Sequence, residues 1–330
     1  MQASCTPHAH FMPAPDPNPF VFGGPQSDRL TLRRGDAVWL QSALDSPDSC
    51  FVPVCDEQSV VLDSGAQASA LILDAKSAKP LLDAAFCIVL LGNYRGRVCF
   101  AVGLSGSGGL PPEASLTNLR AQFHTLDNDT LALLGYARTL VHWHRHHRFC
   151  GKCGAVTHSR HAGHELHCRE CGNVIYPRIN PAVIVLVSQG ERCLLGNQSA
   201  ATPLRYSTLA GFVEPGEDLE TALRREVFEE TNIRVGKVQH RYSQPWPYPA
   251  SLMLGFHAEA INTDIRLNDG ELRDARWFTR DDILAELAAG KLALSSRYSI
   301  SYQLLREWFG APDSGYDMQT LDSAKANRPK

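Results

Sequence analysis

A segment of 23 residues, from Gly211 to Ile233, constrains the fold of this chain more than any other stretch. It reads GFVEPGEDLETALRREVFEETNI, in which a short Pro-Gly turn precedes a run of helix-forming residues. Asp218 follows the turn and is a favourable N-cap residue. We therefore expect a tight loop that leads directly into a helix over residues 218–231.

This helix places carboxylates where only apolar residues are expected. At about 100° per residue, Leu219 and Leu223 define an apolar stripe. Glu226 and Glu230 fall within about 60° of that stripe, and Glu229 flanks it. All three glutamates lie in the C-terminal half of the helix, where the helix dipole disfavours negative charge. A divalent cation such as Mg²⁺ or Mn²⁺ would offset these costs, and the alternative is an ordinary charged helix.

Arg225 lies in the same helix and has two acidic neighbours within reach. Glu229 is four residues further on, which places it on the same helix face. Glu217 belongs to the loop that precedes the helix. We expect Arg225 to hold the loop against the helix.

Four cysteines have the spacing of a zinc ribbon: Cys150-x2-Cys153-x14-Cys168-x2-Cys171. Each Cys-x-x-Cys turn presents two thiolates to one side, and two such turns complete a tetrahedral site. Because all four positions are filled by sulfur, we expect one structural Zn²⁺ per chain. Two unrelated pairs of buried or redox cysteines are the alternative. Six further cysteines are scattered along the chain, a pattern that favours a reducing compartment.

Histidines are concentrated on both sides of the first cysteine pair. They are His142, His144, His146, His147, His158, His161, His164 and His167. They could compete as metal ligands, but the four cysteines already complete a site. We therefore expect these histidines to be exposed residues of a helix and a hairpin.

Composition excludes several classes of function. The 330 residues are enough for two or more domains, and no internal repeat is visible. The formal net charge of −3 gives no electrostatic case for non-specific binding of nucleic acid, so any contacts with RNA should be local. Since no signal peptide and no apolar run of about 20 residues is present, we expect a cytoplasmic protein with no membrane partner.

The segment from Ser243 to Met253, SQPWPYPASLM, has prolines at three alternate positions. Prolines fix φ and remove hydrogen-bond donors, so this segment is not a central strand. We expect a stiff, extended loop that presents Trp246 and Tyr248 for stacking on a planar base. A loop that packs into the core is the alternative.

Apolar periodicity predicts the remaining elements. The predicted strands cover residues 182–187, 252–260 and 275–279, and the predicted helices cover residues 128–147, 281–289 and 299–309. The C-terminal residues are polar, and we expect them to be loose.

The segment at 211–233 resembles the signature box of the Nudix hydrolases, which binds divalent metals against a diphosphate. The segment SQPWPYPAS at 243–251 is similar to the motif that marks the NADH pyrophosphatase branch of this family. The zinc ribbon and the Tyr-Pro-Arg at 176–178 are shared by that branch. One position departs from the box, because Asn232 stands where the family usually has Gly. Asparagine readily adopts left-handed backbone, so we expect the geometry to be kept.

The resemblance implies an α+β protein with a Nudix α/β/α sandwich and a mixed sheet, preceded by a zinc ribbon and an N-terminal α/β domain. It also implies a homodimer. The expected organisation is a flexible N-terminus at 1–27, an N-terminal domain at 28–147, the zinc ribbon at 148–178, the Nudix domain at 179–310 and a flexible tail at 311–330.

Site residues also follow from the resemblance. The ligands of two or three catalytic Mg²⁺ or Mn²⁺ ions fall on Glu226, Glu229, Glu230, Glu271 and the backbone carbonyl of Ala210. The general base stays open between Glu229 and Glu217, and Arg225 completes the catalytic group. Implied substrate contacts are Gln244, Pro245, Trp246, Pro247, Tyr248, Pro249, Ala250, Ser251, Tyr176, Ser301 and Arg120. A further acidic contact of the family falls on Gly163 here, so it is absent or moved, with Glu165 as the candidate.

The implied reaction is hydrolysis of the pyrophosphate bond of NADH or NAD⁺, which gives AMP and reduced or oxidised nicotinamide mononucleotide. Removal of NAD caps from RNA is a related activity on the same bond. One alternative is a Nudix hydrolase for another nucleoside diphosphate derivative such as ADP-ribose, against which the proline-aromatic loop argues. The other is a zinc-ribbon regulator that binds nucleic acid and senses a nucleotide, against which the complete set of box glutamates argues.

Overall fold

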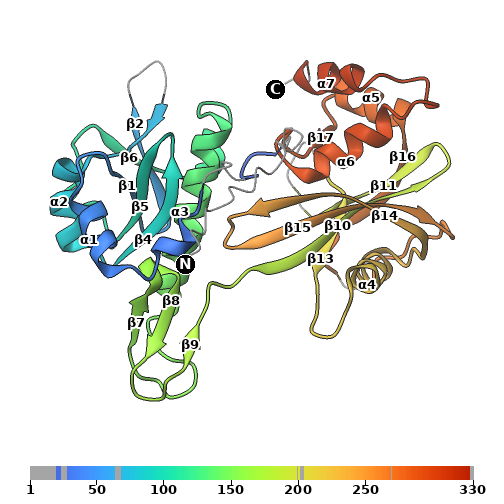
Figure 1. Cartoon of the computed structure of the whole chain (residues 1–330). Coiled ribbons are helices and arrows are strands. Elements are labelled where there is room, and N and C mark those ends of the chain that lie inside the picture. Colours follow the sequence, from blue (N-terminus) through green and yellow to red (C-terminus); the bar gives the residue numbers. More distant parts are fainter. Residues whose placement is uncertain are drawn as a thin grey trace, which may run out of the picture.

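The computed structural model describes residues 20–23, 28–63, 68–198, 200, 204–268 and 270–327. Its N-terminal and C-terminal parts each form a sheet with packed helices, and a small sheet extends from the N-terminal part (Figure 1). Within the described residues, no helix is both long enough and apolar enough to span a membrane.

The N-terminal part is built on a mixed sheet of six strands. Its elements are α1 (Ala37–Asp45), β1 (Cys50–Cys55), β2 (Gln58–Asp63), β3 (Ala68–Ala70), α2 (Ala75–Ala84), β4 (Cys87–Tyr94), β5 (Arg97–Leu104), β6 (Ala114–Thr117) and α3 (Asn128–His146). The strand order is β3-β2-β1-β5-β4, and β6 pairs with β2. Strands β1 and β5 are parallel, and every residue of β1 is buried.

Both faces of this sheet are covered, which explains its continuous apolar strands. Val52 and Val89 pack with Leu134 of α3 on one face. Phe51 and Leu81 of α2 pack on the other face.

The small sheet consists of β7 (Thr157–Arg160), β8 (Glu165–Cys168) and β9 (Val174–Ile175). Between β7 and β8, the chain contacts strand β4 of the N-terminal sheet. A Cβ atom on Gly163 would lie 2.8 Å from the methyl groups of Val89, so this close approach requires glycine.

The C-terminal part has a second mixed sheet, in the order β14-β15-β10-β11-β16, with β13 paired to β10. Its elements are β10 (Asn180–Gln189), β11 (Arg192–Asn197), β12 (Leu204–Tyr206), β13 (Leu209–Phe212), α4 (Leu219–Thr231), β14 (Val235–Trp246), β15 (Ser251–Ala260), β16 (Asp274–Thr279), α5 (Arg280–Ala288), β17 (Leu292–Leu294), α6 (Ile300–Phe309) and α7 (Met318–Ala326). The central strands β10 and β15 are parallel.

Helices cover both faces of this sheet (Figure 1). Helix α4 packs through Leu223 and Val227 on one face. Helices α5, α6 and α7 cover the opposite face. The expected mixed α+β fold is confirmed, and the predicted elements agree with the observed ones to within about two residues at each end.

Both chain ends contain more structure than the sequence predicts. Phe20, Val21 and Phe22 are buried, although this segment is expected to be flexible; residues 1–19 and 24–27 lie outside the described residues. At the other end, α7 occupies part of the expected loose tail. Its Leu321 is fully buried, and its Asp322 accepts a hydrogen bond from Tyr302 at 2.7 Å.

Candidate active site

Helix α4 begins and ends at the residues that its motif predicts. Asp218 is the N-cap, and its Oδ1 accepts a hydrogen bond from the Thr221 N–H at 2.7 Å. At the C-terminus, Asn232 has a φ of 63°, and its N–H donates to the carbonyl of Phe228 at 2.8 Å. The expectation that Asn232 replaces glycine in left-handed backbone is confirmed.

Arg225 joins the preceding loop to the helix. Its Nε and Nη2 donate to the carboxylate of Glu217 at 2.7 and 2.9 Å, and Nη2 also donates to the Phe212 carbonyl at 3.0 Å. Its Nη1 donates to Glu226 and Glu229 at 2.9 and 3.0 Å. The expected contacts of Arg225 with Glu217 and Glu229 are confirmed. The Arg225 guanidinium group lowers the pKa of Glu217 to about 2, so this carboxylate is ionised at neutral pH.

Glu226 lies directly against the backbone of β13. A Cβ atom on Gly211 would lie 1.9 Å from its Cδ, so residue 211 must be glycine for this carboxylate to occupy its place. Burial raises the pKa of Glu226, Arg225 opposes that shift, and the charges of Glu229 and Glu271 add to it. A carboxylate in this environment is stabilised by a cation.

The three box glutamates differ in exposure as the helical projection predicts. Glu230 is 1% exposed, and the Glu226 side chain is 14% exposed. The Glu229 side chain, at the flank of the stripe, is 50% exposed.

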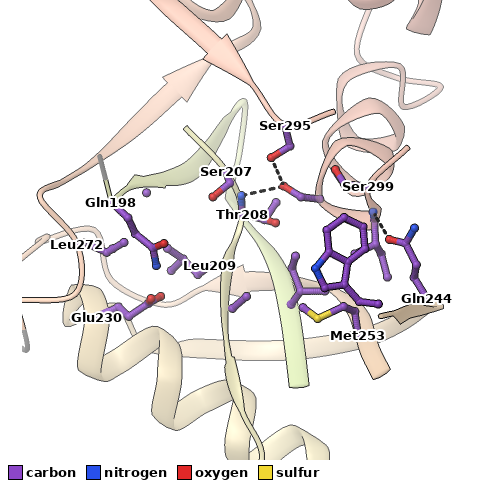
Figure 2. Close-up of a pocket in the computed structure, with 16 residues that line it drawn as sticks. Gln198, Ser207, Thr208, Leu209, Glu230, Gln244, Met253, Leu272, Ser295 and Ser299 are labelled. Carbon is purple, nitrogen blue, oxygen red and sulfur yellow. Dashed lines mark hydrogen bonds between the residues drawn. The ribbon is translucent and has the colours of Figure 1, made fainter. Parts of the chain in front are cut away.

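Glu230 points into a cavity of about 360 Å³. Ala210, Gln244, Trp246 and Ser301 also line this cavity. Figure 2 shows Glu230 and Gln198 on one side, and Ser295, Ser299 and Gln244 on the other. The cavity therefore brings two expected metal ligands together with three expected substrate contacts, whereas Glu226, Glu229 and Glu271 are not among its lining residues.

Gln244 is buried, and its amide bonds to the protein itself. Its Nε2 donates to the carbonyls of Tyr298 and Val21 at 2.8 and 3.2 Å, and its Oε1 accepts from the Ile300 N–H at 2.8 Å. Such a side chain positions neighbouring elements rather than reaching for a ligand.

Ser301 also bonds within the cavity wall. Its hydroxyl accepts from the Thr208 N–H and from the Ser295 hydroxyl, both at 3.2 Å. These bonds connect the start of α6 to the segment before β13.

The proline-aromatic segment differs in part from the expected stiff, extended loop that presents its aromatic residues. Its first residues complete β14, an edge strand in which proline is tolerated. Trp246 lies 5.4 Å from Tyr248 and 6.0 Å from Phe22 between ring centroids. The guanidinium carbon of Arg120 lies 4.1 Å from the Tyr248 ring centroid. Both aromatic residues thus pack against the N-terminal part, and Trp246 also faces the cavity.

Family models match three consecutive parts of the chain. A NADH pyrophosphatase-like rudimentary NUDIX domain matches residues 48–143, a NADH pyrophosphatase zinc ribbon domain matches residues 145–176, and a NUDIX domain matches residues 178–298. The chain is 41% identical to the NAD-capped RNA hydrolase NudC of Stutzerimonas stutzeri over 223 residues, which is 68% of this chain and 79% of that protein. This chain belongs to the NADH pyrophosphatase branch of the Nudix hydrolases.

Further proteins are similar to this chain. NudC of Deinococcus radiodurans is 39% identical over 242 residues, 72% of this chain and 82% of that protein. The human NAD-capped RNA hydrolase NUDT12 is 38% identical over 211 residues, 60% of this chain and 44% of that protein. Among solved structures, a NUDIX hydrolase from Nitrosomonas europaea matches with a TM-score of 0.41 and 20% identity, over 52% of this chain and 94% of that chain.

The zinc ribbon of this Nudix protein has its four cysteine Sγ atoms within 4.8 Å of one another. Cys150 lies 3.6 Å from Cys171, and Cys153 lies 3.4 Å from Cys168, between Sγ atoms. The four thiol groups and their close grouping fit a tetrahedral, structural Zn²⁺.

Two histidines near the ribbon are buried, which corrects the expectation of an exposed cluster. The Nε2 of His144 lies 2.8 Å from the Gly163 carbonyl, and the Nε2 of His164 lies 2.7 Å from the Leu90 carbonyl. These contacts join the ribbon to the N-terminal domain. His142 and His146 instead lie near the carboxylate of Glu57, with the nearest His142 nitrogen 2.8 Å from it.

Among the described residues, the lining of this cavity leaves out most of the expected substrate contacts: Tyr176, Arg120, Pro245, Pro247, Tyr248, Pro249, Ala250 and Ser251. Tyr176 is 64% exposed and follows the ribbon. Glu165, the candidate for the missing acidic contact, accepts from His167 at 2.9 Å within the ribbon.

Several lining residues have no motif that could have revealed them. Gln198, Ser207, Thr208, Ser295 and Ser299 come from strand ends and turns of separate elements. Only the pairing of β12 with β17 and the placement of α6 bring them together.

Proposed function

We propose that this chain hydrolyses the pyrophosphate bond of NADH and NAD⁺, giving AMP and nicotinamide mononucleotide, and removes NAD caps from RNA by the same cleavage. The observation that carries this proposal is the cavity that Glu230 of the Nudix box and Trp246 of the proline-aromatic motif both line. The NudC and NUDT12 relatives are named NAD-capped RNA hydrolases, which supports the same substrate class.

The carboxylates fit a divalent cation. Glu230 is buried, the pKa of Glu226 is raised by burial, and Gly211 leaves room for the Glu226 carboxylate. Ligands for two or three Mg²⁺ or Mn²⁺ ions would come from Glu226, Glu229, Glu230, Glu271 and the Ala210 carbonyl. When bound, these ions would neutralise charge on the phosphates and lower the pKa of a water molecule.

The contacts of Arg225 separate the two candidates for the general base. Glu217 has a pKa of about 2 and is bound by two guanidinium nitrogens, so it is a weak proton acceptor. Glu229 accepts from one guanidinium nitrogen, which it shares with Glu226, and half of its side chain is exposed. We therefore assign proton acceptance to Glu229 rather than to Glu217. In this role Glu229 is not a cation ligand, and Glu217 holds Arg225.

Trp246 offers an aromatic surface at the cavity for the planar end of a dinucleotide. Gln244 acts as a positioning residue, because its hydrogen bonds hold the strand that carries Trp246 against Tyr298 and Ile300.

The deciding experiment is incubation of the zinc-loaded protein with Mg²⁺ and NADH, NAD⁺, ADP-ribose or NAD-capped RNA, with chromatographic analysis of products. We expect AMP and reduced nicotinamide mononucleotide from NADH, and a higher kcat/KM for NADH than for ADP-ribose. Absence of AMP at micromolar enzyme contradicts the proposal.

Glu230→Gln tests the metal assignment. We expect kcat for NADH to fall by more than about tenfold, because a buried metal ligand loses its charge. Glu220→Gln is the matched control, since Glu220 is an exposed residue of the same helix. Retention of activity within tenfold by Glu230→Gln would show the assignment to be wrong.

A homodimer in the cytoplasm belongs to the same proposal. Phe149, Tyr176 and Ile179, all in or beside the ribbon, are each more than half exposed, as is expected of residues that a second copy covers. Four zinc-binding thiolates suit a reducing compartment. Light scattering after size-exclusion chromatography should give twice the chain mass.

A further inference from the structure

The cavity that Glu230 lines is here called the catalytic cavity. A second cavity, of about 690 Å³, lies beside it. Its lining includes four cationic side chains from four separate elements or turns: Arg205, Arg297, Arg306 and Lys325. His124 of the N-terminal part also lines it.

The two cavities share a wall. In the turn between β17 and α6, Ser295 and Ser299 line the catalytic cavity, while Ser296 and Arg297 line the second cavity. Figure 2 shows Ser295 and Ser299 at the edge of the catalytic cavity. The two cavities are therefore separated by a single turn of the chain.

The second cavity is positively charged. Asp322 is its one acidic lining residue among the described residues, and it accepts from Arg306 at 3.0 Å. Arg205 and Arg297 are exposed, and the Arg297 guanidinium donates to the neutral hydroxyl of Tyr298 at 2.8 Å. The chain as a whole carries −3, so this concentration of cations is local.

Arg306 and Lys325 lie beyond the residues that the NUDIX domain model matches, 178–298. The signature box and the proline-aromatic motif therefore do not account for this cavity.

We infer that this second cavity binds the first phosphodiester groups of the RNA chain that follows an NAD cap. This inference rests on the proposed function. The adenosine of an NAD cap is the first nucleotide of the RNA, so the chain continues from the same dinucleotide that the catalytic cavity would hold. Arginine binds phosphate oxygens through two parallel N–H groups, and cations spaced along a groove track a nucleic-acid backbone.

The test compares Arg205→Gln/Arg297→Gln with wild type on two substrates. Both residues are exposed, so the fold should be kept, and a thermal melt checks this. We expect kcat/KM for NAD-capped RNA to fall at least tenfold and kcat/KM for NADH to change less than twofold. Loss of two phosphate contacts should also lower the salt dependence of RNA affinity, a log–log slope, by about 1.4.

The matched control is Lys76→Gln/Lys79→Gln, which removes the same charge from exposed positions of α2. It should leave both activities unchanged. Equal activity of the arginine variant and wild type on capped RNA overturns the inference and leaves the proposed function intact. An equal loss on both substrates also overturns it, because the cavity would then serve the dinucleotide itself.

A binding measurement separates failure of the inference from failure of the proposed function. Fluorescence anisotropy with a labelled 12-nucleotide RNA carrying a 5′-monophosphate needs no hydrolysis. Weaker binding by the arginine variant in a Glu230→Gln background supports the inference even if NADH is not hydrolysed. Undiminished binding, or competition by AMP as effective as competition by unlabelled RNA, overturns it.

Discussion

At the scale of single residues, the site depends on how closely side chains approach the backbone. Glu226 occupies the space that a side chain at residue 211 would need. Arg225 binds Glu217, Glu226 and Glu229 together, so the loop and the helix hold one arrangement. The carboxylates are thus placed before any cation arrives, which lowers the cost of binding one.

Gly211→Ala should displace the Glu226 carboxylate. Its new Cβ would lie 1.9 Å from Cδ of Glu226, and a displacement of about 1 Å at a reacting site costs on the order of a hundredfold in rate. We expect such a loss in kcat for NADH with little change in melting temperature. Gly236→Ala is the control, because its Cβ would meet its nearest neighbour at 3.8 Å. Equal activities of the two variants would refute the steric argument.

The lowered pKa of the Glu217 carboxyl predicts that the stability of the protein depends on pH. This pKa is lowered to about 2 by the hydrogen bonds from Arg225, whereas an unperturbed glutamate titrates near 4.5. The stabilisation is therefore complete above about pH 4.5 and is lost as the pH falls towards 2. We expect the melting temperature of Glu217→Gln to fall less steeply than that of wild type in this range. Identical slopes would show that the ion pair adds nothing.

At the scale of elements, helix α4 is specified by its caps and its stripe, whereas β14 combines two roles. The strand forms the edge of the sheet up to Trp246, and the Trp246 ring packs against the N-terminal part. Gln244 links that strand to the start of α6. The proline-aromatic segment is therefore anchored on both sides, which leaves it little conformational freedom.

The C-cap of α4 gives a prediction at this scale. Asn232 has a φ of 63°, which costs a residue with a Cβ about 1–2 kcal/mol unless a short polar side chain bonds locally. Its Nδ2 donates to the carbonyl of Asp264 at 3.1 Å. We expect Asn232→Ala to lower the free energy of unfolding by about 1 kcal/mol, and Asn232→Gly to be close to wild type. Urea denaturation measures both, and an Asn232→Ala protein as stable as wild type would refute the left-handed cap.

At the scale of the whole molecule, each of the two large sheets contains one parallel pair of strands. The pair is β1 and β5 in the N-terminal sheet, and β10 and β15 in the C-terminal sheet. The match of residues 48–143 to a rudimentary NUDIX domain gives this likeness a family basis, although no repeat is visible in the sequence. The helices that cover the N-terminal sheet, α2 and α3, contain no glutamate, whereas α4 of the C-terminal part carries the box glutamates. The zinc ribbon connects the two parts.

Removal of zinc should destabilise the ribbon that connects the two parts. His164 and Gly163 hold the ribbon against the N-terminal sheet. We expect about one zinc per chain by elemental analysis, and its loss in Cys171→Ser should increase proteolytic cleavage within residues 148–178. Arg169→Ala, which changes an exposed residue of the same knuckle, should keep the zinc. Full zinc content in Cys171→Ser would contradict the four-cysteine site.

Local patterns in the sequence were sufficient to predict helix α4 with both caps, the contacts of Arg225 and the grouping of the four cysteines. The helix, its caps and the two cysteine turns depend on residues a few positions apart, whose geometry is set by the helix period and by turn chemistry. The two cysteine pairs are further apart in the chain, but their shared preference for one metal ion predicts that they meet.

Tertiary structure alone decided which polar groups are buried and where cavities form. Gln244, His144 and His164 are buried because distant backbone carbonyls accept or approach their side-chain nitrogens. The second cavity exists because α7 packs beside α6 and brings Lys325 near Arg205. Burial depends on contacts between segments far apart in the chain, and no spacing within one segment encodes them.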